Sequence, residues 1–185
     1  NYSNIIPNIV LNYVYYKSNG DFQKILDNIF KDKAGIINNS VGFKRMNSNT
    51  VNGKYLGKPV ELDILEEGPL RYAFVASRYD YLRIAKAMLD DWNNDTCVGK
   101  YLKTIYKNRI PKDGNYSGDF GSGRKSESYG GFFHTDFSGI DRPILGMNGF
   151  AGQDIIIDPE RSRIIVINAI HTDYDWDKIV YSVIK

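Results

Sequence analysis

The sequence has few of the residues that build metal sites and disulfides. It contains one cysteine and two histidines among 185 residues, and no apolar run approaches the roughly 18 residues of a membrane span. The single cysteine, Cys97, excludes an internal disulfide framework and leaves the compartment open. His134 and His171 are too few for a histidine-rich metal site. The sequence therefore predicts no metal, no cofactor and no membrane span.

The sequence also lacks a large excess of positive or negative charge. The formal net charge is +2, and the hydrophobic fraction of 42% is that of an ordinary globular protein. Lys100, Lys103 and Lys107 recur at near-helical spacing, which indicates a solvated helix face. These features give no indication of a basic surface that binds polyanions, so we expect no nucleic-acid partner. The length allows one domain with its own core, or a large part of a bigger domain.

Residues 1–112 are predicted to form a helical region. Three stripes of apolar residues follow helical spacing, and a fourth helix is expected over 98–107. The stripes are Ile6, Ile9, Val10, Tyr13 and Val14; Phe22, Ile25, Leu26, Ile29 and Phe30; and Tyr81, Ile84, Ala85, Met88, Leu89 and Trp92. Ser77 and Asp80 indicate the N-terminal cap of the third. Between the second and third helices, residues 38–70 are rich in Asn, Gly and Ser and read as a long loop with weak strand signals.

Residues 113–185 are predicted to form antiparallel strands and a last helix. The segment 113–128 reads as a loop, and 129–137 alternates weakly. Two β-rich runs, 153–158 and 163–170, flank Pro159 and predict an antiparallel hairpin. Apolar spacing predicts a helix near the C-terminus. Helices followed by an antiparallel sheet and a closing helix make an α+β fold, and the two regions together form part of one domain.

Tyr2-Ser3-Asn4 stands at the start of the first helix pattern and has two readings. A serine or asparagine there serves as an N-cap in most proteins. Alternatively, Tyr2 transfers protons and Asn4 orients a neighbour through hydrogen bonds. A tyrosine acts as a general base only when a cation lowers its pKa from about 10. No such cation is adjacent in the sequence, so it would have to come from elsewhere in the fold.

Three glycines, Gly146, Gly149 and Gly152, lie just before the strand at 153–158. Glycines in this position often form only a bulge or a tight turn. They also let a ligand approach the backbone, so that an N–H group can donate to an oxyanion. Both readings stay open on this pattern alone.

The order of these segments resembles the β-lactamase-like serine hydrolases. That family includes class C β-lactamases, penicillin-binding D-alanyl-D-alanine peptidases, family VIII esterases and nylon-oligomer hydrolases. Its members carry Ser-x-x-Lys on a helix, then Tyr-x-Asn, then Lys-Thr-Gly or a substitute on a strand. The resemblance implies a β-lactamase/transpeptidase-like fold. The chain would be its C-terminal part, and the N-terminal part with the nucleophile helix would be missing.

Two departures from the family pattern bear on the activity. Ser122 to Lys125 matches Ser-x-x-Lys, but it follows Tyr-x-Asn and lies in the expected loop, where no helix would place both side chains on one face. We therefore reject it as the nucleophile motif. Lys-Thr-Gly is absent: Ile144-Leu145-Gly146 takes its place in one alignment, whereas the esterase pattern Gly-x-x-Gly-Gln matches Gly149 to Gln153. We prefer the second alignment, because it keeps both glycines and the glutamine.

The resemblance implies acyl-enzyme chemistry on a small-molecule ester or amide. The upstream serine would attack, with its lysine and Tyr2 sharing the proton transfers and Asn4 orienting the lysine or the substrate. The N–H of Phe150, or of Met147 in the other alignment, would help to bind the oxyanion, beside Gly149 and Gln153. The missing cationic lysine favours an esterase or amidase over a β-lactamase or peptidase. A non-catalytic binding protein on the same scaffold is the other alternative.

The resemblance also sets expectations for partners and surface. The missing N-terminal segment of the same protein is the expected partner. The sequence leaves the compartment unknown, and the family's frequent cell-envelope setting favours the bacterial periplasm. Because the family's sheet takes strands from that segment, we expect an exposed sheet edge and a large apolar face. His134 and His171 read as structural or surface residues, and Trp92 and Trp176 read as core.

Overall fold

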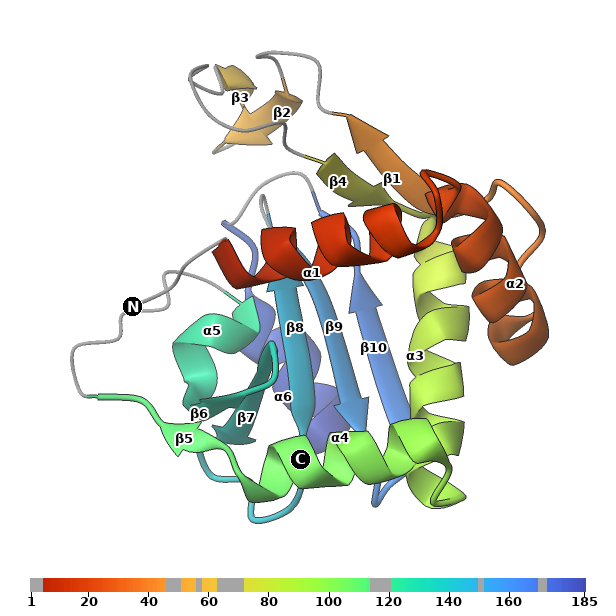
Figure 1. Ribbon diagram of the computed structural model, residues 1–185. Coiled ribbons are helices and arrows are strands. Elements are labelled where there is room, and N and C mark those ends of the chain that lie inside the picture. The colour runs from red at the N-terminus through yellow and green to blue at the C-terminus, as the bar shows by residue number, and fades with distance from the viewer. Residues whose placement is uncertain are drawn as a thin grey trace.

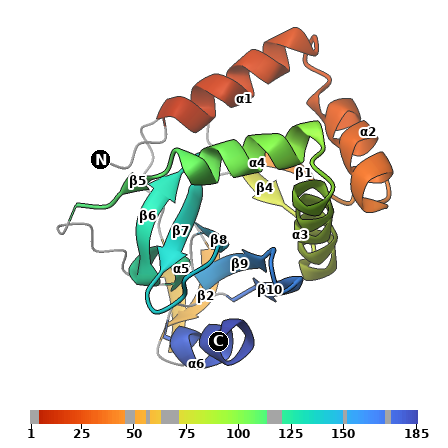
Figure 2. The same cartoon turned by 90° about the horizontal axis from the view of Figure 1, so that it is seen from below.

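The computed structural model describes residues 5–45, 51–55, 58–62, 72–113, 121–149, 152–169 and 173–185. It has an α+β fold, as the sequence predicts, centred on a six-stranded antiparallel sheet with the order β10-β9-β8-β7-β6-β5. Helices α3 and α4 cover one face of this sheet and α6 covers the other (Figures 1 and 2). Two small antiparallel pairs, β1 with β4 and β2 with β3, complete the described strands.

The helices and strands of the described residues have the following bounds. The helices are α1 (Ile5–Lys17), α2 (Phe22–Ala34), α3 (Arg78–Asn93), α4 (Cys97–Lys107), α5 (Gly121–Lys125) and α6 (Trp176–Ile184). The strands are β1 (Gly42–Arg45), β2 (Val51–Tyr55), β3 (Lys58–Leu62), β4 (Tyr72–Val75), β5 (Ile110–Pro111), β6 (Ser126–Gly130), β7 (Phe133–Phe137), β8 (Leu145–Gly149), β9 (Gln153–Asp158) and β10 (Arg163–Ile167).

Five of these helices confirm the apolar spacing of the sequence: α1, α2, α3, α4 and α6. The predicted cap of α3 is also confirmed, because the Ser77 side chain accepts a hydrogen bond of 3.1 Å from the N–H of Asp80. This bond satisfies one of the N–H groups that a helix start leaves unpaired. The hairpin at Pro159 is confirmed as well, with Arg163 of β10 paired to Asp158 of β9.

Two loop predictions need correction. The stretch 38–70, predicted as a loop with weak strand signals, contains β1, β2 and β3. The segment 113–128 contains α5 and most of β6. Helix α5 is too short to be stable by propensity alone and rests directly on β8. A Cβ at Gly146 would come within 2.8 Å of the Ser122 Cβ, so the glycine makes this close approach possible.

The sheet separates two hydrophobic clusters. The first lies under α3 and α4, and the second lies under α6. Phe133 belongs to the first and Phe137 to the second, although both are in β7. Asp136, which has a φ of 55°, interrupts the alternation between them. The tryptophan predictions are confirmed: Trp176 is fully buried in the second cluster, and Trp92 packs against the first.

Apolar side chains are exposed on α1, which lies outside the helix layer in both views (Figures 1 and 2). Those at least half exposed are Ile9, Val10, Tyr13, Tyr15 and Tyr16. In the described sheet, β10 forms the edge opposite to β5. Within the described ranges, no helix combines the length and the hydropathy that crossing a membrane requires.

Candidate functional site

Strand β8 lies in the middle of the sheet, but its two edges are paired very unequally. One edge pairs with β9 along the whole strand, from Leu145 opposite Ile157 to Gly149 opposite Gln153. On the other edge, β7 and β8 are joined through the single pair His134 and Gly146 in the described part of the sheet. Beyond Gly146, β8 therefore leaves the ladder with β7.

Three of the predicted site residues lie together around the end of β8. Met147 packs into the cluster under α3 and α4, so its side chain points away from α5. Gly149 is exposed at the end of the strand. The amide nitrogen of Gln153 donates to the carbonyl oxygen of Ala169, just beyond β10. The glutamine side chain thus ties the start of β9 to the segment that follows β10.

The other predicted site residues cannot be placed against this geometry. Tyr2, Asn4 and Phe150 lie outside the described residues, as does His171. Their expected roles stay predictions from the sequence.

The rejected Ser122 to Lys125 motif is helical in the structure, so the argument that no helix would form there was wrong. The two side chains nevertheless have different surroundings. Ser122 is fully buried, and its hydroxyl has no hydrogen-bond partner among the described residues. The Lys125 ammonium lies 3.0 Å from the Asp177 carboxylate and so does not serve Ser122 as a base. The motif still does not form a serine–lysine pair.

A polar cluster that sequence reasoning missed lies against the same part of β8. The Lys112 ammonium donates to the carbonyl oxygen of Gly123 at 2.9 Å and to the hydroxyl of Ser126. It also lies 3.2 Å from Nδ1 of His134, and Ser126 Oγ lies 3.2 Å from the same nitrogen. An ammonium has three donors and no acceptor, and these three groups can each accept one hydrogen bond from it.

The cluster reaches β8 through His134. Its Nε2 atom lies 2.7 Å from Oδ1 of Asn148, which neighbours Gly149. The ring is buried, and Tyr129 packs against it edge-on with ring centroids 5.0 Å apart. His134 therefore has the buried, hydrogen-bonded surroundings of a structural histidine, but it contacts a strand of the candidate site.

Burial shifts the pKa values of both basic groups downward. It lowers the pKa of Lys112 to about 8, because the charged ammonium loses solvation. Burial also lowers the pKa of His134 to about 4. The nearby Lys112 charge adds to the effect on His134, and the hydrogen bond with Asn148 opposes it. At neutral pH the imidazole is uncharged.

A buried carboxyl group lies on the same face of the sheet. Asp154 of β9, paired with Asn148, accepts hydrogen bonds of 2.8 Å from the Ser122 N–H and from the Trp176 indole. Burial raises its pKa to about 7, although these two donors partly offset the shift. Its Oδ1 atom has no hydrogen-bond partner among the described residues. This carboxyl group links α5 and α6 to the sheet beside the candidate site.

Little in the sequence could have revealed the Lys112 cluster. Lys112 and His134 are 22 positions apart, and they meet because β5, β6 and β7 are consecutive antiparallel neighbours. The one local signal was Asn148, a polar residue within the glycine-rich segment before β9.

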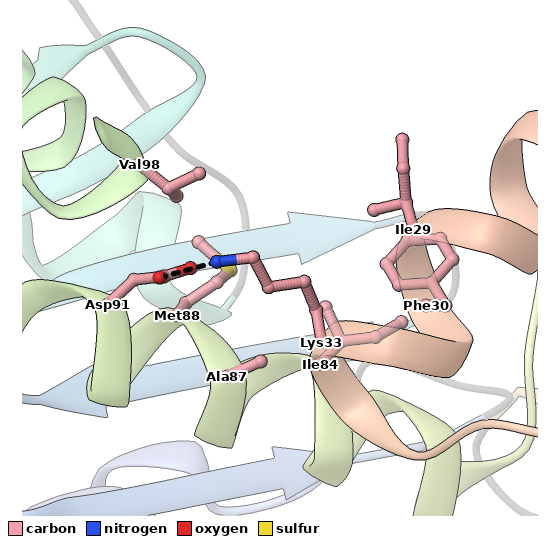
Figure 3. Close-up of a pocket in the computed structure, with 8 residues that line it drawn as sticks. All are labelled: Ile29, Phe30, Lys33, Ile84, Ala87, Met88, Asp91 and Val98. Atoms are coloured by element: carbon pink, nitrogen blue, oxygen red, sulfur yellow. Dashed lines mark hydrogen bonds and ion pairs between the residues drawn. The ribbon is translucent and has the colours of Figure 1, made fainter. Parts of the chain in front are cut away.

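A pocket of about 160 Å³ lies elsewhere, among α2, α3 and α4. Its walls are mainly apolar, and Lys33 and Asp91 form an ion pair of 3.1 Å at its side (Figure 3). The lining residues are Ile29, Phe30, Lys33, Ile84, Ala87, Met88, Asp91 and Val98. They offer no nucleophile or proton-transfer group that is not already in the ion pair. We assign this pocket to helix packing.

The part of the chain that the structure describes holds no group of three His, Cys, Asp or Glu residues suited to a metal ion. Comparison with protein-family models, with curated proteins and with solved structures gives no match. The β-lactamase-like resemblance thus rests on the motifs of the sequence.

Proposed function

We propose that the chain is the C-terminal part of a serine hydrolase that acts by acyl-enzyme chemistry on an ester or amide. The observation that carries this proposal is the short β7–β8 ladder, in which no described residue of β8 beyond Gly146 is paired with β7. Acyl transfer needs backbone N–H groups directed at the position where negative charge develops on the substrate. A strand that leaves its neighbour and ends in an exposed glycine, Gly149, can offer such groups.

The proposed roles of the individual residues follow from the family resemblance. A serine of a Ser-x-x-Lys helix outside the 185 residues would attack the acyl carbonyl, and its lysine and Tyr2 would transfer the protons. Asn4 would orient the lysine or the substrate. The N–H of Phe150 would be the second oxyanion donor, with the N–H of Met147 as the alternative.

The composition of β8 supports an ester or amide substrate over a β-lactam. None of the five residues from Leu145 to Gly149 is cationic, and Met147 is directed into the core. A β-lactam carboxylate would therefore find no lysine on this strand. A neutral ester or amide substrate needs no such cation.

Hydrolysis of p-nitrophenyl butyrate by the natural polypeptide tests the proposal. The wild type is expected to hydrolyse the ester, and Tyr2→Phe is expected to lower kcat by about 100-fold or more, the usual effect of removing a proton-transfer group. Tyr16→Phe is the matched control, since Tyr16 is 80% exposed on α1, and it should leave kcat unchanged. No hydrolysis by the wild type, or equal activity of the two variants, would contradict the proposal.

A further inference from the structure

Asn148 is the polar side chain of β8 that contacts the buried cluster, and it lies between Met147 and Gly149 in the strand. It is half-buried, and its Oδ1 atom lies 2.7 Å from Nε2 of His134. The two ends of a carboxamide differ, because the oxygen only accepts hydrogen bonds and the nitrogen only donates them. The direction of the His134 hydrogen bond therefore decides which end of Asn148 faces the ring.

Lys112 settles that direction. Its ammonium can only donate, so Nδ1 of His134, 3.2 Å away, must act as the acceptor. The Ser126 hydroxyl at 3.2 Å can donate to the same nitrogen, which leads to the same conclusion. A neutral imidazole with a bare Nδ1 carries its proton on Nε2. His134 thus donates to Asn148 Oδ1, and the amino group of Asn148 is at the opposite end of the carboxamide.

Burial restricts this chain of hydrogen bonds to one arrangement. Ser126 and His134 are only 6% and 4% exposed, so water cannot easily replace a lost partner. The Gly123 carbonyl and the Ser126 hydroxyl fix the ammonium, and the ammonium fixes the tautomer of the ring. The chain runs from donor to acceptor in a single sense, from Lys112 through His134 to Asn148.

We infer that Lys112 and His134 are positioning residues, which hold Asn148 so that its amino group donates a hydrogen bond to a carbonyl oxygen of the acyl substrate. The amino group carries two hydrogens, so one can bind a protein acceptor while the other binds the substrate. The identity of this ligand rests on the proposed hydrolase function. The direction of the hydrogen bonds rests on the structure alone.

Kinetics of p-nitrophenyl butyrate hydrolysis test the substrate contact. Asn148→Asp replaces the donor with an oxygen but keeps the acceptor for His134, and it should raise KM by about 3- to 10-fold or more, the value of one hydrogen bond. His134→Phe should raise KM similarly, and His134→Gln should restore it, because the glutamine amide can also donate to Asn148. Lys125→Met, a lysine of α5 bonded to Asp177, is the control and should not change KM.

The double variant separates positioning from a general loss of structure. If His134 acts through Asn148, His134→Phe combined with Asn148→Asp should raise KM no further than Asn148→Asp alone. Additive effects on KM, or an unchanged KM in Asn148→Asp with an active wild type, would overturn the inference.

Nitrogen-15 NMR of the histidine rings tests the chain of hydrogen bonds without any activity. The sequence has only two histidines, so the His134→Gln variant assigns the signals. The neutral Nε2–H tautomer is expected for His134 at pH 7, and a mixture of tautomers is expected in Lys112→Met. An Nδ1–H tautomer or an imidazolium in the wild type would overturn the inference and leave the hydrolase proposal intact. The expected tautomer in a protein that hydrolyses no ester would overturn the function and, with it, the carbonyl ligand.

Discussion

The Nε2 atom of His134 lies 2.7 Å from the Oδ1 atom of Asn148, across the strands β7 and β8. This hydrogen bond joins the two strands close to the point where their ladder ends. It also connects a buried lysine to the strand that carries the proposed site. The stability of this region and the orientation of Asn148 should therefore depend on the same few groups.

His134 should make the protein less stable in acid. Its pKa is about 4 in the folded protein and 6.5 ordinarily, so the unfolded chain binds more protons between these values. The contribution is fully present above pH 6.5 and is lost as the pH falls toward 4. Urea unfolding at pH 4.5 and pH 7 should show a smaller drop for His134→Gln than for the wild type, by an amount on the order of 2 kcal/mol. Equal decreases in the free energy of unfolding for the two proteins would show that the His134 ring is not held neutral.

Asp154 should make the protein less stable as the pH rises, which is the opposite of the effect of His134. Its pKa is about 7 in the folded protein and 3.8 ordinarily, so the folded protein binds more protons between these values. The stability that this group contributes at low pH is lost as the pH rises through 7. Asp154→Asn keeps an acceptor for the Ser122 and Trp176 donors but does not ionise. Its free energy of unfolding relative to the wild type should therefore rise between pH 4 and pH 8, by roughly 2–4 kcal/mol.

A fixed difference between the Asp154→Asn variant and the wild type across that pH range would contradict this prediction. Thermal unfolding in the same buffers provides an independent measurement.

Gly146 should not tolerate a side chain. A Cβ there would come within 2.8 Å of both the Phe137 ring and the Ser122 Cβ, so α5 would have to move away from β8. Gly146→Ala should lower the free energy of unfolding by about 1–3 kcal/mol, as overpacking does in other cores. Gly149→Ala is the control, since its Cβ would come only within 3.3 Å of the Gln153 Cβ. Denaturation midpoints that shift equally for both would argue against the close contact of α5 with β8.

Two ion pairs of different burial should respond differently to removal of the cation. The Asp158 carboxylate is fully buried and lies 2.7 Å from Arg142, whereas Lys86 and Asp90 form an exposed pair of 2.6 Å on α3. Arg142→Met leaves a buried charge unpaired and should cost about 3–5 kcal/mol of stability. Lys86→Met should cost less than about 1 kcal/mol. A small loss in Arg142→Met, measured by urea unfolding, would mean that water reaches Asp158.

The structure agrees with the sequence where local signals are strong. Apolar spacing and the Ser77 cap predicted α3, and the β-rich runs around Pro159 predicted β9 and β10. Local sequence patterns did not predict the structure where tertiary contacts determine the backbone conformation. Helix α5 has five residues and depends on the space above Gly146, which no local pattern reveals.

The candidate site shows the same division. The glycine-rich segment directed attention to Met147, Gly149 and Gln153, and the structure brings these residues together at the end of β8. Lys112 was missed and His134 was read as a structural residue, because their contact depends on the order of three strands.

The most direct test of the central claim is to locate the adduct of a fluorophosphonate probe on the natural polypeptide by mass spectrometry. A serine hydrolase should take up one probe molecule, on the serine of a Ser-x-x-Lys segment outside the 185 residues. The adduct should be absent after heat denaturation, because only a folded site activates the serine. An adduct on Ser122 or Ser126, or no adduct on the folded protein, would contradict the account.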